Sequence, residues 1–203
     1  MRPLIDGWSI VIIGIWNYRI FNPEWIKKNI LDDQNVINVS MALNMPSIKF
    51  DFETLSIIVS DTRLQVMPKS DDLSCLPKMQ EVIVKVLKTL EHTPVSAVGV
   101  NFRFKIEEDT ERFENVFRLS DNERIINMLN EKTDIIRRFS FKDFVFLLFL
   151  TISNEPFIEN NLIDFNFHKD ISSTHEAIDL LSHDINVFYN KANDVFDMLY
   201  KKE

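Results

Sequence analysis

The first half of the chain combines short apolar, extended segments with two helical patterns. Residues 9–20 are rich in β-branched and aromatic side chains, which predicts a strand. Asn22 and Pro23 then provide an N-cap and a first helical residue, so a short helix should follow to about Leu31. The other predicted elements are strands at residues 36–43, 48–52, 55–60 and 63–67, and a helix at residues 77–90.

The second half begins with a strand that has one apolar and one polar face, because the two kinds of side chain alternate over residues 95–106. The apolar positions are Val98, Val100, Phe102, Phe104 and Ile106, and the polar positions are Asn101, Arg103 and Lys105. Helices are predicted near residues 110–117 and 121–129, and strands at residues 136–141, 144–152 and 162–168.

A long terminal helix is predicted from about residue 174 to residue 200. Ser173 and Glu176 form a capping box at its start. Apolar side chains then recur every three or four positions, at Ile178, Leu181, Ile185, Phe188, Ala192, Val195 and Leu199. This stripe can pack on the chain's own sheet or against a partner helix.

Both halves have the order strand, helix, three or four strands, helix. This repetition predicts an internal duplication, with one unit at residues 1–94 and the other at residues 95–203. The element order resembles the duplicated TATA-box-binding-protein-like, or helix-grip, architecture. The resemblance implies an α+β fold in which both units form one curved antiparallel sheet with the helices on one side. It does not carry function with it.

A second resemblance rests on two short runs of sequence, residues 92–102 and residues 164–167. The first run reads HTPVSAVGVNF and the second reads DFNF. Together with the terminal helix, they are similar to a sporadically distributed family of uncharacterised bacterial proteins. The patchy distribution of such families implies an accessory role, for example in phage defence. No catalytic residue follows from this resemblance.

The charge of the chain argues against a nucleic-acid partner. The 203 residues include 23 Lys and Arg against 31 Asp and Glu, which gives a formal net charge of −8. Most of the negative excess lies in residues 95–203, and basic clusters do not exceed two adjacent side chains. Proteins that bind DNA or RNA usually present a basic patch to the phosphates.

Composition excludes several further classes of function. Only 3 glycines are present, too few for the usual phosphate-binding loops. The single cysteine, Cys75, allows neither an internal disulfide nor a multi-cysteine zinc site. The longest apolar runs, residues 10–16 and 144–152, are shorter than the ~20 residues that cross a bilayer. We therefore expect a cytoplasmic protein with no membrane span and no cofactor.

Histidine provides the best candidate for metal or acid–base chemistry. His175, Asp179 and His183 are spaced four residues apart along the terminal helix, and His168 ends the preceding strand. The three helical side chains point away from the apolar side of the predicted helix, so a solvated polar face explains them better than a metal site. Asp164 and His168 lie on the same face of the predicted strand. This face either lines a polar pocket or is exposed to the solvent.

Two predicted strands are apolar on both faces, at residues 9–16 and 144–152. Helices cover only one face of a single sheet, so the sheet curls or another molecule covers the second face. Candidate interaction residues are Trp16, Phe146, Phe188, Val195 and Leu199.

These patterns favour a non-catalytic α+β protein that acts by association, as a homodimer or as a small subunit of a bacterial complex. The terminal helix is the favoured docking element. One alternative is a small-molecule-binding module that holds an apolar or mixed ligand in the concavity of the sheet. A second alternative is a metal-dependent enzyme built on His168, His175, Asp179 and His183.

Overall fold

The computed structural model describes residues 2–30, 38–42, 46–106, 133–142, 145–152, 162–183 and 185–200. The strands are β1 (Arg2–Pro3), β2 (Ser9–Gly14), β3 (Asn38–Ala42), β4 (Ser47–Asp51), β5 (Leu55–Ser60), β6 (Arg63–Pro68), β7 (Val95–Lys105), β8 (Thr133–Ser140), β9 (Val145–Ile152) and β10 (Leu162–Asp170). The helices are η1 (Ile5–Gly7), η2 (Tyr18–Ile20), α1 (Pro23–Asn29), α2 (Cys75–Thr89), α5 (Thr174–Leu181) and α6 (Asn186–Tyr200). The helices predicted near residues 110–117 and 121–129 lie outside the described residues.

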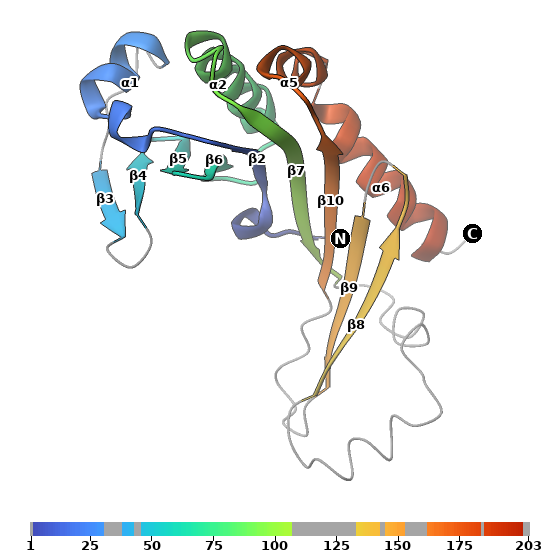
Figure 1. Ribbon diagram of the computed structural model, residues 1–203. Coiled ribbons are helices and arrows are strands. Elements are labelled where there is room, and N and C mark those ends of the chain that lie inside the picture. Colours follow the sequence, from blue (N-terminus) through green and yellow to red (C-terminus); the bar gives the residue numbers. More distant parts are fainter. Residues whose placement is uncertain are drawn as a thin grey trace.

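The ten strands of the described ranges form one antiparallel, curved sheet, which confirms the α+β fold class (Figure 1). The order is β3-β4-β5-β6-β2-β7-β10-β9-β8, and β1 pairs with the end of β7. In both halves the first long strand lies at the centre and the last strand lies beside it, as β2–β6 and β7–β10. This order is compatible with a duplication of residues 1–94 and 95–203, which stays a prediction.

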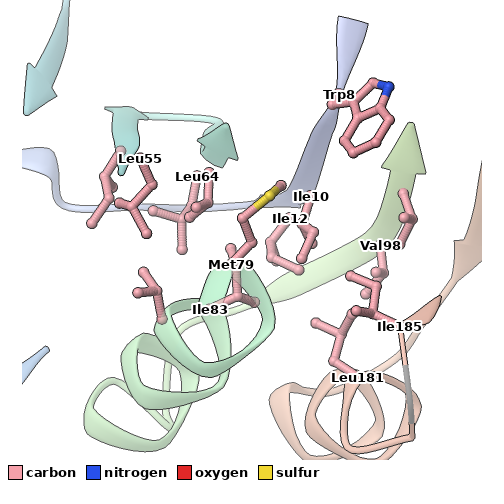
Figure 2. Packing of buried hydrophobic residues seen from close by; sticks show 14 of the residues in the cluster. Trp8, Ile10, Ile12, Leu55, Leu64, Met79, Ile83, Val98, Leu181 and Ile185 are labelled. Carbon is pink, nitrogen blue, oxygen red and sulfur yellow. The ribbon is translucent and has the colours of Figure 1, made fainter. Parts of the chain in front are cut away.

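One face of the sheet is buried under α2, α5 and α6. Figure 2 shows Ile10 and Ile12 of β2 and Val98 of β7 facing Met79 of α2 and Leu181 of α5. On β7 the apolar side chains predicted to share a face are all buried. The alternation of residues 95–106 therefore predicted this strand and its orientation correctly.

An aromatic cluster joins the N-terminal segment to α6. The ring of Trp8 lies edge-on to Phe102 and to Tyr189, with 5.4 Å between ring centroids in each pair. Its indole Nε1 donates a hydrogen bond to the backbone oxygen of Arg103 at 3.2 Å. Buried aromatic rings in this geometry contribute packing energy beyond their area, so Trp8 fixes residues 2–8 against β7.

Local sequence explains how α1 begins and why β2 is shorter than predicted. The side chain of Asn22 accepts a hydrogen bond from the amide of Trp25 at 2.9 Å, which confirms the predicted cap.

The strand predicted over residues 9–20 ends at Gly14 instead. A Cβ atom at Gly14 would lie 2.5 Å from the carbonyl oxygen of Pro94, so only glycine allows this close approach. The sheet register shifts at this point, and residues 18–20 form a 3-10 turn.

The prediction of one terminal helix over residues 174–200 was wrong, because the chain forms α5 and α6 with a break between them. The amide of Ser182 bonds to the oxygens of Ile178 and Asp179, which closes α5. The side chain of Gln80 in α2 then donates to the backbone oxygens of Leu181 and His183. These bonds satisfy carbonyls that a continuous helix would have paired. The apolar spacing continues across the break, since both segments bury their apolar sides.

We expect Phe102→Ala to lower the free energy of unfolding by about 3–5 kcal/mol, because the ring is buried in the aromatic cluster and its loss leaves a cavity. Met198→Ala in α6, where the side chain is 80% exposed, should change it by no more than about 0.5 kcal/mol. Urea denaturation followed by circular dichroism measures both. Equal effects of the two substitutions would contradict this placement of the core.

Candidate functional site

The face of the sheet that points away from α2, α5 and α6 is called the open face here. Val11 and Ile13 of β2 point to it, and Ile15 follows just beyond the strand. Ile13 is 38% exposed and Ile15 is 72% exposed. We call these three residues the apolar stripe. The chain's own helices cover the Ile10 and Ile12 side of β2, so the covering of the second face by another molecule stays a prediction.

Polar and small side chains flank the stripe. The register places Ile58, Gln65, Val11 and Gly99 side by side across four strands. A Cβ atom at Gly99 would meet no heavy atom nearer than 3.8 Å, so this position leaves a shallow area rather than a crowded one. Charged side chains lie directly across from the apolar ones, since Arg63 is paired in register with Ile13 and Lys49 with Ile58. The open face thus combines apolar side chains with close polar neighbours.

An ion pair on this face connects β7 to β10. The guanidinium of Arg103 donates from Nε to Oδ1 of Asp164 at 2.6 Å and from Nη2 to Oδ2 at 2.7 Å. Asp6 lies 3.9 Å from the same guanidinium. Donation of these hydrogen bonds to Asp164 raises the pKa of Arg103 above its ordinary value. The two-bond geometry holds both side chains in fixed positions on this face.

A second polar group lies on β4 and β5. Asp51 accepts a hydrogen bond from Ser56 at 2.6 Å, and the ammonium groups of Lys49 and Lys69 lie 3.0 and 3.6 Å from its Oδ1. Burial by itself would raise the pKa of Asp51, but the hydrogen bonds from Ser56 and Lys49 and the two lysine charges outweigh it and lower the pKa. Asp51 is therefore held as a carboxylate.

A pocket of about 440 Å³ lies where β10 meets the C-terminal helices, and we call it the edge pocket. Its apolar lining consists of Val98, Val100, Phe167, Leu180 and Phe188. The rings of Phe167 and Phe188 are in contact, with 5.3 Å between centroids. These two rings form one apolar wall.

The mouth of the edge pocket is polar. It is lined by Lys142, His168, Lys169 and Asp170. His168 Nε2 lies 3.1 Å from Asp170, and the ammonium of Lys169 lies 3.9 Å from Glu176. Within the described part of the chain, the ammonium of Lys142 has no hydrogen-bonding or ionic partner.

The structure does not bring the predicted metal-ligand candidates together. His168 contacts Asp170 on β10, whereas His175 lies 3.6 Å from Asp179 on α5. His183 bonds to the backbone oxygen of Asp179 rather than to its carboxylate. Among the described residues, no three His, Cys, Asp or Glu side chains converge to hold a metal ion.

The predicted interaction residues have different surroundings. Trp16 is 3% exposed and packs against Phe21 in the core. Phe188 and Val195 are half-buried and pack on the chain's own core, and Phe188 also lines the edge pocket. The side chains of Phe146 in β9 and Leu199 in α6 lie outside the described set.

Sequence reasoning singled out His168 and Phe188 of the edge pocket but missed several other residues of the two sites. Ile13 and Ile15 lie inside the segment that was singled out, and strict alternation with Ile10 and Ile12 was the signal that places them on the second face. Lys142 and Leu180 enter the edge pocket only through tertiary structure, so no local pattern marks them.

Comparison with known proteins adds no assignment. No protein-family model matches the sequence, and no curated protein matches it either. None of the helices in the described ranges is both long and apolar enough to cross a membrane.

The lowered pKa of Asp51 predicts a pH-dependent contribution to stability. A carboxyl group whose folded pKa lies below its ordinary value of 3.8 stabilises the fold above that pH and loses this contribution as the pH falls through the folded pKa. The difference in unfolding free energy between the wild type and Asp51→Asn should therefore shrink steadily between about pH 6 and pH 2. Urea denaturation at a series of pH values measures it. A difference that does not depend on pH would contradict the assignment.

Proposed function

We propose that this protein is a non-catalytic interaction subunit that binds a partner protein with the open face of its sheet. The observation that carries the proposal is the apolar stripe, in which Ile13 and Ile15 remain exposed while the opposite side of β2 is buried. Contiguous apolar surface of this kind is usually covered in a functional assembly.

The arrangement around the stripe supports a protein surface as the occupant. Protein interfaces commonly have an apolar, well-packed centre and a polar rim. The open face offers both kinds of contact, because Val11, Ile13 and Ile58 are apolar while Arg63 and Lys49 are paired in register with Ile13 and Ile58.

The charged side chains beside the apolar stripe indicate which groups the partner's surface should carry. Arg63 lies directly across from Ile13 on the neighbouring strand, so a matching surface places apolar side chains in the centre and carboxylates opposite the arginine. The whole chain carries a formal charge of −8, which opposes association of two copies. We therefore favour a different protein over a homodimer.

This proposal moves the docking element from the terminal helix to the sheet. The apolar side of α6, which the sequence favoured for docking, packs on the core through Phe188, Tyr189 and Val195. Among its described side chains, the exposed apolar ones are Val187 at 58% and Met198 at 80%, which lie near opposite ends of the helix. The helix is therefore used mainly inside the chain.

Ile15→Asp should weaken partner binding at least about tenfold, because a carboxylate at the interface centre opposes desolvation. The side chain is largely exposed, so we expect the unfolding free energy to change by no more than about 0.5 kcal/mol. The measurement is quantitative co-purification of tagged protein from the native host, followed by a direct titration with the isolated partner. Ile13→Asp should act in the same direction.

Met198→Asp is the matched control, since it introduces the same charge at an equally exposed apolar position in α6. It should leave binding unchanged. Light scattering distinguishes a homodimer, with twice the 23.9 kDa chain mass, from a complex with a different protein. The proposal fails if the wild type is a partnerless monomer, or if Met198→Asp removes the partner while Ile15→Asp retains it.

A further inference from the structure

We propose that the edge pocket binds a small ligand that has an apolar body and a carboxylate group. This site lies at the outer half of β10, and the inference neither uses nor requires the protein interaction proposed for the open face.

The position of the pocket follows from the strand registers. β7 pairs with β10 as far as Asp170, whereas β9 pairs with β10 only from Leu162 to Asn166. Figure 1 shows this upper part of β10 extending past the end of β9 toward α5. The pocket lining begins at the next residue, Phe167, and continues through Asp170.

The lining also shows that the pocket lies at the edge of the strand rather than on one face. Phe167 and Lys169 point to the helix side, since they are paired in register with Val100 and Val98, whereas His168 and Asp170 point to the other side. Residues of both sides line the same pocket, so it wraps around the border of β10. A ligand there reaches the apolar interior without displacing a helix.

The interior suits an apolar body. Val98, Val100 and Phe167 are buried and form the floor, and Leu180 and Phe188 form the helical wall. The volume of about 440 Å³ falls within the range of about 300–1,000 Å³ that is typical of small-molecule sites. Apolar floors with a few polar groups at the mouth are the common composition of such sites.

The mouth can hold a carboxylate. Lys142 and Lys169 supply two ammonium groups. Asp170, the one carboxylate of the lining, is paired with His168, and Glu176 lies 3.9 Å from the ammonium of Lys169. Lys142 has no partner among the described residues, which leaves it able to bind an anionic group. Lys142 is therefore the main contact expected for the carboxylate, with Lys169 beside it.

The test uses three probes that share an eight-carbon chain and differ in head-group charge: octanoate, 1-octanol and octyltrimethylammonium. Isothermal titration with the full chain should give the order octanoate, 1-octanol, octyltrimethylammonium, with about five- to tenfold between the anion and the cation, because exposed ion pairs contribute modestly. Amide resonances of His168 and Lys169 should shift on addition of octanoate. Equal affinity for all three probes, or shifts confined to the open face, would overturn the proposal.

Substitutions separate the head-group contact from the apolar contact. The double variant Lys142→Glu and Lys169→Glu should invert the order, so that the cation binds more tightly than octanoate. Lys88→Glu in α2 makes the same charge change away from the pocket and should leave the order unchanged. Leu180→Trp fills the half-buried wall and should weaken all three probes about equally.

Thermal denaturation of each variant without probe shows whether the fold is retained. If the double variant folds and still prefers octanoate, the proposal is wrong. Because Ile15 lies outside the pocket lining, Ile15→Asp should bind octanoate as the wild type does. Failure of the ligand proposal is thereby distinguished from failure of the partner proposal.

Discussion

The antiparallel pairing of β2 with β7 is the constraint on which the rest of the structure depends. Its register, Ile10 opposite Val100 and Ile12 opposite Val98, sends those four side chains to the helices. The same register sends Val11 and Gly99 to the open face. A slip of one residue would exchange the two faces, which the buried helix side does not tolerate. Gly14, with its close approach to Pro94, ends this pairing at a fixed place.

The sequence predicted those parts of the fold whose signal is local. Alternation over residues 95–106 placed β7 correctly, and Asn22 with Pro23 placed the start of α1. The break between α5 and α6 was not predictable in this way, because apolar spacing continues across it. The hydrogen bonds from Gln80, about a hundred residues earlier in the chain, satisfy the backbone at that break. Contacts of such sequence separation leave no mark on local periodicity.

The candidate sites were predictable only in part, for the same reason. Composition indicated that β2 is apolar on both faces, but choosing Trp16 over Ile13 and Ile15 required knowing which face the helices cover. His168 and Phe188 were both singled out, yet as members of different groups, and the fold brings them to one pocket. Lys142 and Leu180 line the same pocket, which begins on β10 at Phe167, just past the last residue paired with β9, Asn166. That boundary is a property of the sheet and not of any one segment.

Charge gives the two candidate sites a shared character. The chain is acidic as a whole, but Arg63 borders the apolar stripe and two lysines border the edge pocket. Interactions between exposed charges more than about 8 Å apart are largely screened at physiological ionic strength. An anionic partner or ligand at either site therefore experiences the nearby cations more strongly than the distant carboxylates. The net negative charge of the chain repels an anionic partner or ligand at long range and slows its association, whereas the nearby cations hold it once it is bound. Added salt should therefore weaken the long-range repulsion more than the short-range attraction.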